Sequence, residues 1–237
     1  METTTKALIL KKVPYSGSSY IVQTYTREKG VIPFLVRGIG KKKGNNRSLI
    51  EPLSFVEISF HFREKYEVQT AKSISNDFPT GGLFFDPIKS TVQLFLAEIL
   101  VKALREETAD EDLFDYLYSS ISLFREDENQ RDFHLIFLLK LTRFLGFFPN
   151  GKKSSSTPYF DLQNGEFCSH RTQSLHTLDL IESDDLSAVM IAEYGSPLSF
   201  NQERKRKALD FLVEYYRLHL EGFGELKSLG VLKEVFA

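Results

Sequence analysis

Cysteine is almost absent from this chain, since Cys168 is the only one among 237 residues. A disulfide within the chain is therefore excluded, and so is a zinc site built from several cysteines of one chain. A lone thiol is typical of proteins from a reducing cytoplasm, where disulfides are rare. We therefore expect a cytoplasmic protein that uses no cofactor and no metal.

Long apolar runs are also missing. A membrane-spanning helix needs roughly 18 to 20 consecutive apolar residues. The most apolar stretch, residues 133–148, is interrupted by Lys140 and Arg143. The first residues, METTTKALILKK, do not combine a charged segment with a following apolar segment, as a secretory signal does. We expect no membrane partner.

Common catalytic motifs are lacking as well. The five histidines form no HExxH pattern, and neither GxSxG nor GxGxxG is present. Cys168 and His170 are close in the sequence, but sequence neighbours rarely form a catalytic pair. We therefore expect a protein that is not an enzyme.

Charge is distributed unevenly along the chain. The total formal charge is −2, yet residues 1–80 hold 13 Lys and Arg against 7 Asp and Glu. This part carries +6, which leaves −8 for residues 81–237. The asymmetry predicts that the N-terminal part attracts polyanions. The alternative is a random scatter of surface charge.

The first 80 residues show the alternation of short strands separated by turns. The predicted strands cover residues 7–10, 20–26, 31–37, 53–62 and 66–75. In the third, Ile32, Phe34 and Val36 share one face, and Arg37 points the other way. Five such strands predict a small OB-fold barrel in residues 1–80, although the pattern also fits an SH3-like barrel.

Residues 81–237 are predicted to be mainly helical, which gives an α+β protein. Asp86 and Pro87 are typical of a helix start, and apolar residues then recur at helical spacing. A helix over about 131–145 is apolar on nearly every side, so we expect it at the centre of a bundle. Residues 150–181 are polar and turn-rich, and we predict a small inserted hairpin there.

The clearest functional signal is the loop RGIGKKKGNNR, residues 37–47. Its cations predict neutralisation of phosphates with little sequence preference. We assign DNA binding to these five residues: Arg37, Lys41, Lys42, Lys43 and Arg47. The alternative is a solvated loop, and a P-loop is excluded because the GxxxxGK[ST] spacing is missing. Aromatic residues of the strands, Tyr66 among them, are assigned no role, because most strand aromatics belong to a core.

Two further groups of cations lie in the helical part. Lys140 and Arg143 interrupt the apolar helix, where they either reach solvent or receive the carboxylates of a partner peptide. We assign them tentatively to such a peptide. Arg204 to Lys207 open the last long helix, where cations oppose the helix dipole. Two roles remain possible for these four cations: contact with a phosphate or carboxylate, or a solvated face without a partner.

The sequence resembles the RecO family of recombination mediators. The resemblance is carried by residues 7–44, with Thr26-x-Glu28-x-Gly30 and Arg37-Gly38, by FLLKLTRFLGFFP (137–149) and by LKSLGVLKEVF (226–236). It spans nearly the whole chain. It implies an N-terminal OB fold, a helical domain and, in many members, a zinc-ribbon-like insertion.

The resemblance further implies what the protein does. A RecO-like mediator binds single- and double-stranded DNA and anneals single strands. It associates with RecR, contacts the acidic C-terminal tail of single-stranded DNA-binding protein, and helps to load RecA. Residues 1–80 would then be the DNA-binding domain of a bacterial protein associated with the nucleoid.

One departure from the family concerns zinc. Zinc-bearing members have two CxxC pairs around the hairpin, whereas this chain has Lys152 and Lys153 in the first region and only Cys168 in the second. We therefore expect no zinc. Two alternatives to a DNA mediator remain: an enzyme acting on nucleic acid, which the missing acidic metal cluster disfavours, and an OB-fold protein that binds RNA or the ribosome.

Overall fold

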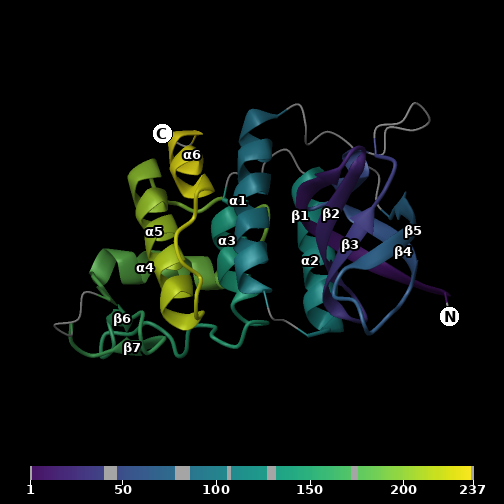
Figure 1. Cartoon of the computed structure of the whole chain (residues 1–237). Helices are drawn as coiled ribbons and strands as arrows, with labels where there is room; N and C mark the ends of the chain where they lie inside the picture. The colour runs from purple at the N-terminus through teal and green to yellow at the C-terminus, as the bar shows by residue number, and fades with distance from the viewer. Residues whose placement is uncertain are drawn as a thin grey trace. The chain divides into compact units, whose positions relative to one another are not determined.

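The computed structural model describes residues 2–39, 47–77, 86–105, 108–126, 132–171 and 176–235. The chain divides into two compact units, Met1–Arg125 and Glu126–Ala237. Figure 1 shows the strands of a barrel in the first unit and mostly helices in the second. The predicted boundary after residue 80 lies outside the described residues and stays a prediction.

A closed five-stranded barrel forms the N-terminal part of the first unit. Its strands are β1 (Glu2–Ser16), β2 (Ser19–Thr26), β3 (Gly30–Val36), β4 (Phe55–His61) and β5 (Gln69–Asn76). They close in the order β1-β2-β3-β5-β4. The long strand β1 pairs with both β2 and β4, and β3 runs parallel to β5. The predicted OB-fold barrel followed by helices is confirmed.

Two strand starts differ from the prediction by three residues or more. Strand β1 begins at Glu2, five residues early, because the threonines at its start favour extended backbone and pair in register with β4. Strand β5 begins at Gln69, and Tyr66 to Val68 lie in the preceding loop. Apolar patterning alone shows neither of these two features.

The barrel core follows the predicted alternation. Ile32, Phe34 and Val36 are buried, and Phe34 meets Phe60 of β4 edge to face at 4.9 Å between ring centroids. Arg37, next along the chain, is exposed. Inward and outward side chains alternate in a strand, so the register that buries Phe34 also directs Arg37 to the surface.

Two helices belong to the same unit as the barrel. Helix α1 (Pro87–Ala103) starts as predicted, because the Asp86 carboxylate accepts hydrogen bonds from the backbone N–H groups of Ile88 and Lys89. Helix α2 is Glu111–Glu126. It packs on the barrel through Phe114, whose ring lies 6.0 Å from that of Phe55.

The second unit is mainly helical, with α3 (Phe133–Leu141), α4 (Leu180–Ile191), α5 (Gln202–His219) and α6 (Ser228–Val235). Helix α3 is buried on all sides except at Lys140. It ends at Leu141, earlier than predicted, in a turn where the Thr142 hydroxyl donates to the Leu139 carbonyl at 2.6 Å. None of the described helices is long and apolar enough to cross a membrane.

The predicted inserted hairpin is present. Strands β6 (Tyr159–Asp161) and β7 (Glu166–Cys168) pair antiparallel, and the short β8 (Thr177–Leu178) adds to β6. The turn is closed by the Asp161 carboxylate, which accepts from the backbone N–H groups of Gln163 and Asn164. Phe160 packs against Phe167 of β7 and Tyr215 of α5. Aromatic packing therefore joins this hairpin to the helices.

Candidate nucleic-acid interface

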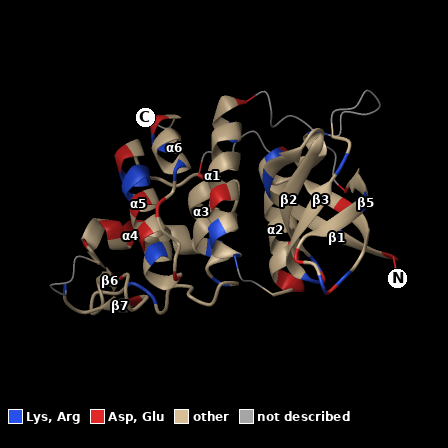
Figure 2. Ribbon diagram, in the orientation of Figure 1, with Lys and Arg blue, Asp and Glu red and all other residues tan. Residues whose placement is uncertain are grey.

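A basic groove of about 440 Å³ opens on the barrel. It lies where β3 and β4 end and where the loop 62–68 leads into β5. Figure 2 shows Lys and Arg at strand ends and turns of the barrel. The groove is lined by Arg37, His61, Arg63, Tyr66, Val68, Gln69, Thr70 and Lys72.

Strand register explains why cations gather in this groove. Strands β3 and β5 run parallel, with Leu35 opposite Thr70. Arg37 and Lys72 each follow this pair by two residues, so both line the same groove. The Lys72 Nζ lies 2.6 Å from the Glu2 carboxylate. This contact holds the pKa of Glu2 below its usual value. Lys72 nevertheless remains largely exposed.

The groove's aromatic residue stands on a loop that a buried glutamine holds in place. Gln69 is only 3% exposed. Its amide oxygen accepts from the Arg63 N–H at 2.9 Å, and its amide nitrogen donates to the Arg63 carbonyl at 3.0 Å. The same nitrogen donates to the Tyr66 carbonyl. The loop is thereby fixed while the side chain of Tyr66 stays 52% exposed.

The structure places the predicted DNA-binding residues unequally. Arg37 is exposed and lines the groove, and Arg47 is exposed just before the short 3₁₀ helix Ser48–Ile50. Lys41, Lys42 and Lys43 lie outside the described residues. Sequence reasoning missed Lys72 and Gln69, because only the parallel pairing of β3 with β5 brings them beside Arg37. It missed Arg63 because the Gln69 side chain holds the backbone of that residue.

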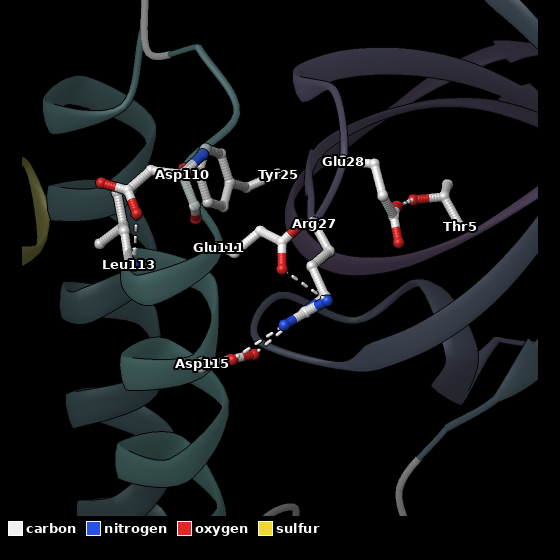
Figure 3. A network of polar contacts seen from close by, with 8 residues as sticks. All are labelled: Thr5, Tyr25, Arg27, Glu28, Asp110, Glu111, Leu113 and Asp115. Atoms are coloured by element: carbon white, nitrogen blue, oxygen red, sulfur yellow. Dashed lines mark hydrogen bonds and ion pairs between the residues drawn. The ribbon is translucent and has the colours of Figure 1, made fainter.

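Arg27, at the turn after β2, is paired with two carboxylates of α2 in the same unit (Figure 3). Arg27 donates to both carboxylate oxygens of Asp115 at 3.1 and 3.0 Å, and it forms an ion pair with Glu111 at 2.9 Å. This pairing lowers the pKa of Asp115 and raises that of Arg27. The turn after β2 is thus tied to α2, and Arg27 does not belong to the groove.

The Thr26-x-Glu28-x-Gly30 motif builds the same turn. The Thr26 hydroxyl donates to the Gly30 carbonyl at 2.9 Å and accepts from the Lys29 N–H at 3.2 Å. Glu28 accepts a hydrogen bond from Thr5 of β1. Gly30 has φ +67°, a left-handed conformation that glycine adopts without strain. The motif is therefore explained by the fold.

The residues assigned to a partner peptide each lie over an aromatic ring. The Lys140 Nζ is 2.7 Å from the Glu193 carboxylate and 4.9 Å from the centroid of Tyr194. The Arg143 guanidinium lies 4.2 Å from the centroid of Phe148. Arg143 follows the end of α3, so the two cations stand on a helix and on a turn rather than on one helix.

The basic run that opens α5 is used partly inside its own unit. Arg204 pairs with the buried carboxylate of Asp185 on α4. Lys205 pairs with the buried Asp132 at 2.7 Å, and Lys207 lies 3.5 Å from Glu203. A buried carboxylate without a partner would be costly. Stabilisation of the fold thus explains Arg204 and Lys205.

Arg206 instead borders a small pocket of about 80 Å³ in the second unit. Leu209 and Leu232 provide apolar walls, and Lys205 and Lys233 also line the pocket, each in an ion pair with a carboxylate, Asp132 and Asp210 respectively. His134 also lines it, and burial lowers the pKa of this histidine to about 4. Sequence reasoning missed this pocket, because its walls come from α5, α6 and the start of α3.

Comparison with known proteins agrees with the resemblance. The family model "Recombination protein O N terminal" matches residues 1–76, and "Recombination protein O C terminal" matches residues 85–230. A DNA repair protein RecO of Bacteroides fragilis is 38% identical over 242 residues, covering 98% of both chains. Those of Azobacteroides pseudotrichonymphae and Flavobacterium johnsoniae are 34% and 30% identical, covering 98% and 100% of both chains. This chain therefore belongs to the RecO family of DNA repair proteins.

Proposed function

We propose that this chain is a recombination mediator that binds and anneals single-stranded DNA. With RecR, it helps to load RecA onto DNA covered by single-stranded DNA-binding protein, and it binds double-stranded DNA as well. Its place of action is the bacterial cytoplasm, at the nucleoid. The observation that carries the proposal is the basic groove of the barrel, in a chain that belongs to a DNA repair family.

The charge of the groove fits a phosphate backbone. Arg37, Arg63 and Lys72 line it, although the whole chain carries −2. Cations that neutralise phosphates release counterions, so affinity falls as salt rises and depends little on sequence. The loop residues 41–43 and Arg47 belong to the same proposed interface, since they continue the chain from Arg37.

Annealing needs no catalytic group. Two DNA strands repel each other through their phosphates, and a cationic surface that holds both weakens this repulsion. We therefore propose a protein that acts by binding alone. Among the described residues, no group of three or more His, Cys, Asp or Glu is placed to hold a metal ion.

We propose two alternative binding sites for the acidic tail of single-stranded DNA-binding protein. The first is Lys140 with Arg143, whose cations lie over the rings of Tyr194 and Phe148. The second is the pocket at Arg206, where this cation lies beside the apolar walls of Leu209 and Leu232. An acidic peptide with a terminal apolar residue requires this combination.

The proposal is tested by direct binding. A labelled single-stranded oligonucleotide is titrated with the protein, and unlabelled DNA or RNA of equal length competes. We expect DNA to compete better than RNA and the recovered DNA to be intact. Stronger competition by RNA would favour the RNA-binding alternative, and metal-dependent cleavage would favour an enzyme.

A further inference from the structure

We propose that Tyr66 stacks on an unpaired base and thereby makes the barrel groove selective for single-stranded over double-stranded DNA. Gln69 is the positioning residue that holds Tyr66 in place. This inference rests on the proposed function, because it names the part of the DNA that the groove recognises.

The first support is the exposure of the ring at the right place. Two of the barrel's other aromatic residues, Tyr25 and Phe34, are fully buried. Phe62 is partly exposed, but the Lys29 Nζ lies 4.4 Å from its ring centroid. Tyr66 is 52% exposed and lines the basic groove. An aromatic face beside cations is the arrangement that binds single strands without sequence preference.

The second support is preorganisation. A flexible loop would lose conformational entropy when it ordered on a ligand, and this loss would weaken binding. Here the buried Gln69 side chain already makes three hydrogen bonds to the backbone of Arg63 and Tyr66. The loop carries these bonds in the free protein, so the backbone that bears the Tyr66 ring is held at the groove before DNA arrives.

The third support is the charge on the same groove. Arg63 stands near the start of the loop, Arg37 directly follows β3, and Lys72 lies on β5. A base stacked on Tyr66 carries its own 5′ and 3′ phosphates, which these cations attract. A single strand can stack a base on the Tyr66 ring and pair its phosphates with the cations at the same time. In a duplex the bases are paired and stacked on each other, so only the phosphates can interact with the groove, through its cations.

The test compares Tyr66→Ala with Tyr66→Phe and with Tyr15→Ala. Tyr15 is another exposed tyrosine of the barrel, at 63% against 52% for Tyr66, and it does not line the groove. Binding is measured by fluorescence polarisation on three ligands of equal length: a single strand, the same strand with abasic sites, and a duplex. We expect Tyr66→Ala to weaken single-strand binding about tenfold, as for the loss of one stacked base.

The same substitution should change neither abasic-strand nor duplex binding, because no exposed base face is lost there. Tyr66→Phe and Tyr15→Ala should bind all three ligands like the unaltered protein. The salt slope should stay unchanged in Tyr66→Ala and fall by about 0.7 in Arg63→Ala, which removes one phosphate contact. Gln69→Met should weaken binding of the ordinary single strand more than binding of the abasic strand, and its thermal unfolding midpoint should show that the protein is still folded.

Two results would overturn the inference: unchanged single-strand binding by Tyr66→Ala, or an equal loss on the ordinary and the abasic strand. In both cases Arg63→Ala still weakens binding if the proposed function is right. Absence of single-strand binding by the unaltered protein is a separate outcome and would contradict the proposed function itself.

Discussion

Removing two cations from the groove gives the sharpest test of its electrostatics. Arg37→Ala combined with Arg63→Ala leaves the fold intact, because both side chains are exposed and surface changes of this kind cost little stability. Each lost phosphate contact lowers the salt slope by about 0.7 for a single strand. The double substitution should therefore lower the slope by about 1.4.

This slope difference has a visible consequence. Between about 50 and about 200 mM salt, the unaltered protein should lose about sevenfold more affinity than the double variant. The two titration curves should thus approach each other as salt rises. Polarisation titrations at four salt concentrations measure this directly, and Lys11→Ala, an exposed cation of β1 that does not line the groove, is the matched control.

An equal salt slope in both proteins would refute the reasoning. It would mean that Arg37 and Arg63 do not contact phosphates, whatever the absolute affinity. A fall in the slope of Lys11→Ala as large as in the double variant would show that total charge matters rather than the groove.

Three more predictions follow from the other sites. Replacing the lysines of residues 41–43 by alanine should weaken binding of all DNA sequences alike, with an unchanged thermal midpoint, in a titration of several oligonucleotides. Lys140→Ala with Arg143→Ala should weaken binding of an acidic, Phe-ending peptide and spare DNA binding, whereas loss of peptide binding in Arg206→Ala alone would place the tail at the α5 pocket. Urea denaturation should show stability falling by at most about 3 kcal/mol as pH drops from about 6.5 to 4, because the pKa of buried His134 is lowered to about 4. His134→Leu should lack this part of the pH dependence.

The direction of this pH effect follows from linkage. The unfolded chain takes up a proton on His134 near pH 6.5, while the folded protein does so only near its lowered pKa of about 4. The unfolded state therefore binds more protons between these values. The stabilisation is complete above pH 6.5 and is lost as pH falls through this window.

Local patterns in the sequence were sufficient for the barrel. The alternation of Ile32, Phe34 and Val36 correctly predicted which face is buried, because inward and outward side chains alternate in every strand. Asp86 and Pro87 likewise marked the start of α1. Both signals act between residues that are neighbours in the chain, so the sequence shows them directly.

The groove could be predicted only in part. Arg37 was predicted from its loop, but Lys72 joins it only through the parallel pairing of β3 with β5, which no local pattern reveals. The predicted strand from Tyr66 fails because the Gln69 side chain, rather than a neighbouring strand, binds the backbone there. The ion pairs of Arg204 and Lys205 could not be predicted either, because their buried carboxylate partners come from distant segments of the chain.

The central claim, that the barrel groove anneals DNA strands, is tested most directly by an annealing assay. Complementary labelled strands covered with single-stranded DNA-binding protein are mixed with this chain, and duplex formation is followed over time. The account predicts that the unaltered protein accelerates annealing and that Arg37→Ala with Arg63→Ala loses most of this acceleration at low salt. Full acceleration by the double variant, or none by the unaltered protein, would contradict it.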